Sequence, residues 1–317
     1  MAKRMRWLVM LLIVTLAVGC GGGDEEGTES SGQATATTMG QSHDHSSGSP
    51  VESDDSVEMH VYLVASELVV GENRFAVGLQ TPDNAIIDEA DVTFTYYDLS
   101  DPATPALESN ATAQPLASLD GLTVIYAHQR TFDRAGHWGV QIDATQPDGT
   151  VLSRNIAFDV LEDSPSLAIG ETAPSIDSPT SADVDGDLTR ITSASEPNPA
   201  FYDVSIADAL ANEKPTVVLF ATPAFCQTRF CGPDYEIVSS VQQRYGDQLN
   251  FVHVEVYSGL PNPEANGFQF AQPMHDFGLT TEPWLYVIDA DGTVTWRVEG
   301  LFTVDEVIES IAMVGVE

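Results

Sequence analysis

The chain has very little positive charge. Its 317 residues include 12 Lys and Arg against 48 Asp and Glu, and its only lysines are Lys3 and Lys214. The formal net charge is −36. A surface this acidic repels the phosphates of DNA and RNA, so we expect no nucleic-acid partner. Solubility in a salty setting explains the charge better than an acidic binding face does.

The chain also lacks an apolar run long enough to cross a membrane. The N-terminal apolar stretch covers only residues 7–16, which is too short to span a bilayer. Basic residues precede this stretch, and small residues ending in Cys20 follow it. This pattern is typical of a secretory signal. We therefore expect residues 1–20 to be a signal peptide and the remainder to be exported.

The end of this segment, Ala17-Val-Gly-Cys20, resembles the lipobox of bacterial lipoproteins, although that pattern more often has Leu where Ala17 stands. The resemblance implies that Cys20 is lipidated and becomes the mature N-terminus. It also implies a protein that is lipid-anchored on the extracytoplasmic face of the cell membrane. The alternative is an ordinary cleaved signal in which Cys20 has no role.

Cysteine is otherwise scarce, because only Cys226 and Cys231 follow Cys20. Outside the cytoplasm disulfides can form, and a chain of this size needs none for stability, so a reactive pair is favoured over a structural one. Cys226 follows an apolar strand-like run, residues 216–220, and precedes a helix-like segment. A thiol at such a junction lies near helix amides and the positive end of the helix dipole, which lowers its pKa. Cys231 can then resolve what Cys226 forms, so the pair predicts thiol redox chemistry.

Composition divides the remaining chain into four segments. Residues 21–56, rich in Gly, Ser, Thr and acids, predict a disordered tether, in which His43 and His45 lack the fixed geometry of a metal site. Residues 57–162 predict an all-β domain, residues 163–200 a linker and lead-in rich in Ser, Pro and Asp, and residues 201–317 an α/β domain.

The all-β domain is predicted from short runs rich in Val, Ile, Tyr and Phe, separated by turn residues and without a helical period. This pattern favours a β-sandwich of immunoglobulin-like type. The domain holds His60, His128 and His137, but a copper or zinc site would need them to converge, and we assign no metal site. The expected strands are Val57–Ala65, Arg74–Gln80, Val92–Leu99, Leu122–Phe132, His137–Ala144 and Val151–Val160.

Residues 201–317 alternate between strand and helix signals. The run 216–221 is continuously apolar, as expected of a central strand buried on both faces. A helix over 234–245, a strand over 250–257, a hairpin around 289–292 and a helix that begins with a capping box at Thr303 follow in order.

This order, and the segments around Cys226 and Pro283, resemble a thioredoxin-like or redoxin domain over roughly residues 165–317. The matching segments are FATPAFC, ending at Cys226, TEPW, starting at Thr281, and IGETAP, ending at Pro174. The resemblance implies a cis peptide at Pro283, a partner groove shaped by Pro283 and Thr281, and no cofactor. Its implied partners are protein thiols and disulfides. Trp284 is expected either as a wall of the site or as a core aromatic.

The cysteine spacing departs from this family, since Cys-x4-Cys replaces the usual Cys-x-x-Cys. On an ideal helix this spacing suits a disulfide poorly, so Cys226 is expected in the loop before the helix, or the first turn must unwind on oxidation. Arg229 between the cysteines is expected either to stabilise a thiolate or to be a solvated surface residue.

Three alternatives remain open. A Sco-like copper-binding protein or metallochaperone would use both cysteines and a histidine, for which His275 is the nearest candidate. A thiol peroxidase of peroxiredoxin Q type shares Cys-x4-Cys, but it has Thr three residues before the first cysteine, where this chain has Pro223 and places Thr222 one residue further away. A non-enzymatic binding module would carry the cysteines as a static disulfide.

Overall fold

The computed structural model describes residues 58–317. The expected signal peptide, the lipidation site Cys20, the tether and His43 and His45 lie outside the described residues. Within 58–317 no helix is both long and apolar enough to cross a bilayer.

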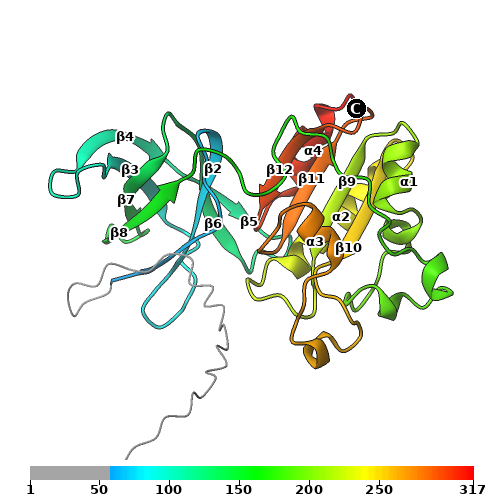
Figure 1. Ribbon diagram of the computed structural model, residues 1–317. Coiled ribbons are helices and arrows are strands. Elements are labelled where there is room, and N and C mark those ends of the chain that lie inside the picture. Colours follow the sequence, from blue (N-terminus) through cyan, green and yellow to red (C-terminus); the bar gives the residue numbers. More distant parts are fainter. Residues whose placement is uncertain (1–57) are drawn as a thin grey trace, which may run out of the picture. The chain divides into compact units, whose positions relative to one another are not determined.

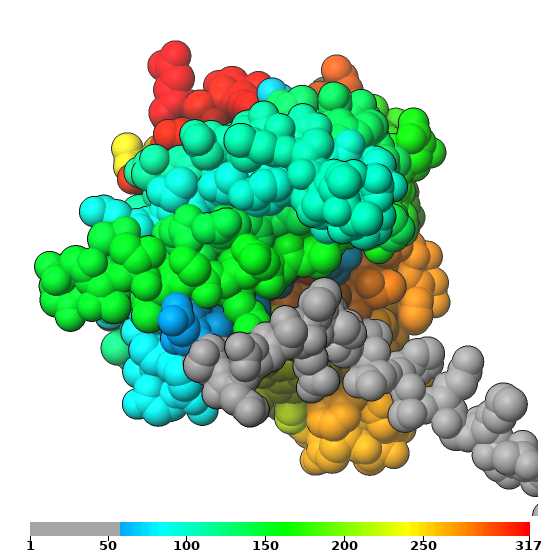
Figure 2. Space-filling model, turned by 90° about the vertical axis from the view of Figure 1, so that its left-hand side faces the viewer, coloured from blue at the N-terminus to red at the C-terminus, as the bar shows by residue number. Residues whose placement is uncertain are grey.

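The first part of the described chain is all-β and contains two four-stranded antiparallel sheets (Figure 1). One sheet has the order β1-β2-β6-β5, formed by His60–Leu63, Gly71–Gln80, Val124–Phe132 and Gln114–Ala117. The other has the order β4-β3-β7-β8, formed by Ala106–Thr112, Asp91–Asp98, Gly136–Thr145 and Val151–Val160. The latter sheet forms the cyan and green face seen in Figure 2.

One hydrophobic core joins the two sheets. Phe75 of β2 lies edge-on to Phe94 and Tyr96 of β3, with ring centroids 5.3 and 5.4 Å apart. These rings pack with Phe132 and Trp138 in a single buried cluster. Edge-to-face contacts add to the burial of large rings, so this cluster holds the sandwich together. The all-β prediction is confirmed, and the immunoglobulin-like type stays a prediction.

The sequence pattern predicts six strands of this part and misses β4 and β5. Both are outer strands of their sheets, and neither contains a buried residue. A strand that buries no side chain needs no alternation of polar and apolar residues, so the signal used to find the other strands is absent. Pro115 in β5 weakens the strand signal further.

The second part is α/β. Its sheet has the order β10-β9-β11-β12, with β10 parallel to β9 and the other pairs antiparallel. Strand β9 is buried along its whole length, as its continuous apolar run predicts. The order of elements is the one expected for a thioredoxin-like domain. The strands are Thr216–Ala221 (β9), Asn250–Glu255 (β10), Trp284–Ile288 (β11) and Val294–Glu299 (β12).

Helices cover both faces of this sheet. The side chains of β9 alternate, so Val217 and Leu219 face one helical layer while Val218 and Phe220 face the other. Helices α2, Cys231–Tyr245, and α4, Val304–Ala312, form the first layer. Helices α1, Ile206–Ala211, and α3, Gln272–Asp276, form the second. The capping box expected at Thr303 begins α4.

Residues 163–200 are folded against the α/β sheet. Thr172 forms a bridge with Thr293 beside β12, and short 3-10 helices follow at Ala182–Val184, Leu188–Arg190 and Pro199–Tyr202. A fourth such turn lies at Pro263–Asn266. The Ser193 amide and hydroxyl bond the buried carboxylate of Glu255, so this segment helps to enclose the region described next.

The sandwich and the α/β part belong to one compact unit. Arg74 of β2 forms an ion pair of 2.8 Å with Glu306 of α4 and donates to the carbonyl of Leu301 at 2.7 Å. Arg297 of β12 forms a second pair, of 2.7 Å, with Glu67. Leu301 is itself buried among side chains of β2 and β6, so both polar and apolar contacts join the two parts.

Candidate active site

The two cysteines lie at the junction between β9 and α2. Cys231 is the first residue of α2 and is fully buried. Cys226 lies five residues earlier in the connecting loop and is half-buried. Of the two arrangements that the Cys-x4-Cys spacing allows, the structure has the one in which Cys226 precedes the helix. Both thiols are free.

The surroundings of Cys226 stabilise a thiolate. The amide N–H of Cys231 donates to the Cys226 Sγ at 3.3 Å, and the Thr228 hydroxyl lies 3.3 Å from the same sulfur. The Cys231 side chain has the largest effect, and with the Thr228 hydroxyl and the Cys231 N–H it lowers the pKa of Cys226 to about 5 against the opposing effect of burial. The sulfur also faces the start of a 15-residue helix, whose dipole favours negative charge there.

Cys231 has the opposite environment. Burial, with the negative charge of the neighbouring Cys226 sulfur, raises the pKa of the Cys231 thiol. One thiol is therefore partly accessible and ionised at neutral pH, while the other is enclosed and protonated. Such a division suits a nucleophile and a resolving thiol.

A carboxylate that the sequence pattern does not predict completes the site. Oxygen of Glu282 and both sulfurs lie within 4.8 Å of one another. The Glu282 Oε1 accepts the amide N–H of Gln227 at 3.2 Å. Burial raises the pKa of Glu282 to about 7. Its place directly before Pro283, in the segment expected beside the reactive sulfur, is the signal that could have found it.

The structure places the residues expected around Pro283 partly at a cavity and partly in the core. The Glu282–Pro283 peptide is cis, as the family resemblance implies. Thr281 lines a cavity beside the loop, donates to Glu299 Oε1 at 2.6 Å and accepts from Trp284 Nε1 at 3.1 Å. Trp284 is buried in the cluster with Tyr286, so of its two expected roles the structure has the core aromatic.

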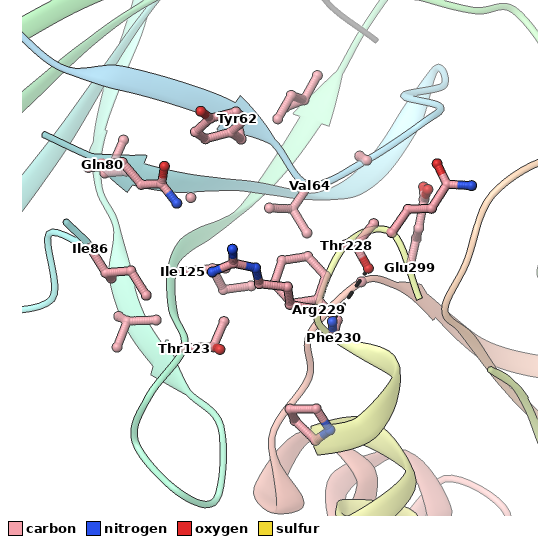
Figure 3. A pocket seen from close by; sticks show the side chains of 18 of the residues that line it. Tyr62, Val64, Gln80, Ile86, Thr123, Ile125, Thr228, Arg229, Phe230 and Glu299 are labelled. Atoms are coloured by element: carbon pink, nitrogen blue, oxygen red, sulfur yellow. Dashed lines mark hydrogen bonds between the residues drawn. The ribbon is translucent and has the colours of Figure 1, made fainter. Parts of the chain in front are cut away.

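Arg229 lies away from the thiolate. It is exposed, at a positive φ of 70°, and its guanidinium extends toward Ile125 of the sandwich (Figure 3). No hydrogen bond or ion pair of the described residues joins it to either sulfur. The partners of the Cys226 sulfur are Thr228 and Cys231 instead. The backbone turn sets the direction of Arg229, and spacing alone does not reveal it.

The α/β part contains further buried ionisable groups. Burial raises the pKa of Glu255 to about 7 and raises the pKa of Asp234, in the first turn of α2, well above its usual value. Burial also lowers the pKa of His253 to about 4. His253 donates from Nε2 to the Ala221 carbonyl at 3.1 Å and accepts the Tyr202 hydroxyl at 2.8 Å, which is a structural role.

In the described part of the chain, the two cysteines and a histidine do not lie close together, as the copper site of a Sco-type protein would require. Among residues 58–317, the group of thiol, carboxylate and imidazole side chains close enough to hold one ion is Cys226, Cys231 and Glu282. His275, on α3, is not a member of it. The sandwich histidines do not belong to it either, and His137 pairs with Asp159.

The threonine that a peroxidase of the peroxiredoxin Q type places near its cysteine is not in the expected position here. Thr222 is fully buried, and its hydroxyl has no hydrogen-bond partner among the described residues. Pro223 occupies the position three residues before Cys226. A peroxide would therefore meet no threonine hydroxyl in the expected place.

No protein-family model matches the chain, and no curated protein does. Among solved structures, dsbF of MTB is 24% identical, matching 35% of this chain and 87% of its own, with a TM-score of 0.29. A thioredoxin-family thiol:disulfide interchange protein of Chlorobium tepidum TLS is also 24% identical, matching 46% of this chain and 97% of its own, with a TM-score of 0.32. These likenesses are too low to assign a chemistry to the chain.

Proposed function

We propose that the protein is a thiol–disulfide oxidoreductase that acts through Cys226 and Cys231. One observation carries the proposal, namely the opposite environments of two neighbouring thiols. Cys226 is partly accessible with its pKa lowered to about 5, whereas burial raises the pKa of Cys231. Strongly perturbed groups that differ in this way are typical of a reactive site.

The two thiols support exchange through a mixed disulfide. The Cys226 thiolate attacks one sulfur of a substrate disulfide, whose S–S bond breaks as the other substrate sulfur leaves as a thiolate. Cys231 then loses its proton, attacks the Cys226 sulfur and releases the second substrate sulfur. Two electrons have passed to the substrate, and the reverse sequence oxidises a substrate dithiol. The reduction potential of the pair sets the direction.

Glu282 is suited to accept the proton of Cys231. Its carboxylate oxygen lies within 4.8 Å of both sulfurs, and its pKa of about 7 is close to the pH at which exchange would run. Thr281 and Pro283 shape the groove in which the partner segment lies, and Arg229 binds that segment. Trp284 supports Thr281 from the core through its indole N–H.

The proposed setting follows from the N-terminal sequence. A signal peptide would export the chain, Cys20 would anchor it on the extracytoplasmic face of the membrane, and residues 21–56 would hold the two folded parts clear of the lipid. The partners there are protein thiols and disulfides. Exported proteins form disulfides in such compartments, so substrates are available.

Trapping tests the proposal. The Cys231→Ser variant should accumulate mixed disulfides with partner proteins, because the resolving thiol is missing, and Cys226→Ser should form none. Absence of adducts, with an unchanged alkylation rate at Cys226, would argue against exchange chemistry. A reduction potential below about −300 mV would mark the pair as an inert structural disulfide and favour the binding-module alternative.

A second function is favoured by the closeness of Glu282 to both sulfurs. Two thiolates and a carboxylate offer a three-ligand set, and thiolates suit Cu(I). Titration of the reduced protein with Cu(I) against a chromophoric chelator measures this. Tight one-to-one binding that Glu282→Gln weakens would support this set. Weakening by His275→Ala alone would support the Cys/Cys/His set instead.

A further inference from the structure

A cavity of about 800 Å³ opens beside the cysteine loop, between that loop and the sandwich. Figure 3 shows its two walls. Tyr62, Ile86 and Ile125 line it from the sandwich, and Thr228 and Arg229 line it from the loop. Its size is that of an ordinary ligand site, and it lies next to the proposed nucleophile.

The sandwich wall carries several large apolar side chains on the outer face of an antiparallel sheet, with Gln80, Asp120 and Thr123 among them. Residues of β2 alternate, so Phe75 and Val77 fill the sandwich core while Ala76 and Gly78 lie on the opposite face. An outer face exposed to water normally carries polar side chains. Here Leu301 and Phe230 of the α/β part cover one portion of that face.

The remaining portion is open. Tyr62 of β1 pairs in register with Gly78, and 51% of its surface is exposed. Leu122, in the turn before β6, also lines the cavity and is 71% exposed. Large apolar side chains left open at the rim of a cavity mark binding sites.

The loop wall of the cavity reaches the immediate neighbours of the reactive sulfur. Thr228 lines the cavity and lies 3.3 Å from the Cys226 Sγ. Glu282, whose carboxylate lies near both sulfurs, also lines it. A chain segment whose sulfur is bonded to Cys226 therefore has the sandwich wall within reach of its neighbouring side chains.

Arg229 indicates the charge of a group that would bind in the cavity. Arg229 projects into the cavity, is the one basic side chain of its lining and, among residues 58–317, forms no ion pair. The acidic side chains of the lining are Asp120, Glu282 and Glu299. A carboxylate on the occupant would complement it.

We propose that this cavity binds an extended segment of a partner protein beside its reacting cysteine, with apolar side chains against Tyr62 and Leu122 and an acidic side chain at Arg229. The inference rests on the proposed exchange chemistry and deepens it. It makes the sandwich part of the substrate site, and it makes polypeptides with apolar sequence around the cysteine better substrates than small disulfides.

The test compares second-order rate constants of the reduced full chain with three disulfides. Two are peptides whose cysteine is joined to glutathione, one flanked by Leu, Tyr and Glu and the other by Gly, Ser and Lys. The third is 5,5′-dithiobis(2-nitrobenzoate), which has no flanking chain. The apolar peptide should react about tenfold faster than the polar one, since each buried apolar side chain lowers the free energy of the complex.

Variants test whether the preference for the apolar peptide comes from the cavity wall. Tyr62→Ser with Leu122→Asp should remove the preference and leave the rate with the small disulfide unchanged. Leu107→Asp, at a similarly exposed leucine on β4 outside the cavity, is the matched control and should change neither. Arg229→Glu should shift the preference from an acidic toward a basic flank. Circular dichroism checks that each variant is folded.

The outcomes separate the two proposals. If the small disulfide reacts but the two peptides react equally, or if the double variant keeps the preference, the cavity is not the substrate site. If none of the three disulfides reacts with the wild-type chain, the exchange chemistry itself is wrong and the cavity inference falls with it.

Discussion

The two parts of the molecule bury very different kinds of side chain. The core that joins the two sheets of the sandwich is made of aliphatic and aromatic groups. The α/β part instead encloses Asp234, His253, Glu255 and Glu282 together with Cys231. Burying a carboxyl or imidazole group opposes folding unless it is paired or neutral. The core of the sandwich therefore stabilises the fold. The buried ionisable groups of the α/β part lower its stability near the cysteines, where chemistry is proposed.

The largest expected effect is on the core of the sandwich. Phe75→Ala removes the ring that contacts Phe94 and Tyr96, and it should lower the free energy of unfolding by about 3–5 kcal/mol. Exchange of the molecules that remain folded with a small disulfide should be unchanged. Denaturant titration and exchange assays at low temperature measure the two quantities, and a loss of exchange in folded protein would contradict the division of roles.

The next effect concerns the buried carboxylate beside the sulfurs. Glu282→Gln should slow the resolving step by about 10²-fold, because the proton of Cys231 loses its acceptor. In the wild type this step should accelerate as the pH rises through about 7, where Glu282 ionises, and the variant should lack that rise. Stopped-flow measurement of release from a preformed mixed disulfide gives the profile, and identical profiles would remove Glu282 from the proton path.

The third prediction compares the two thiols directly. Alkylation of Cys226 by iodoacetamide should fall about tenfold between pH 6 and pH 4, since its pKa is about 5. Cys231 should stay unmodified until the protein unfolds. Because the folded pKa lies below the usual value of 9.0, the thiolate stabilises the native state fully above about pH 9, and this contribution is lost progressively as the pH falls from about 9 to about 5. Mass spectrometry of each cysteine peptide follows both rates.

The smallest effect concerns Asp234. Burial raises its pKa in the folded state, so the native carboxyl holds a proton that the unfolded chain releases above about pH 4. Stability should therefore fall as the pH rises toward the folded pKa. Asp234→Asn lacks this cost and should raise the Tm by about 2 °C at pH 8 but not at pH 4. Calorimetry at the two pH values tests it, and an equal shift at both would show a role unrelated to ionisation.

Periodic burial is what made most of the fold predictable. Strand β9 buries both faces and appears as a continuous apolar run, and Val252 and Val254 of β10 share one face as their alternation predicts. Strands β4 and β5 bury nothing and leave no such pattern. Side-chain periodicity thus predicts elements that contribute to a core and misses those that only complete a sheet.

The site was predictable in its sulfurs but not in their neighbours. Cys226, Cys231 and Pro283 could be found because their residue types are distinctive at those positions. Glu282 is one acid among many, and only folding brings it to the sulfurs. The direction of Arg229 depends on a single backbone turn with positive φ, which spacing does not encode.

The hydrogen bond from the Cys231 amide to the Cys226 sulfur has one further consequence. That N–H is an orphan donor of the first turn of α2, and its acceptor is a sulfur whose charge disappears when the pair is oxidised. The amide resonance of Cys231 should therefore move with redox state. A single backbone signal in an NMR spectrum would then report the redox state of the cysteine pair without any added dye.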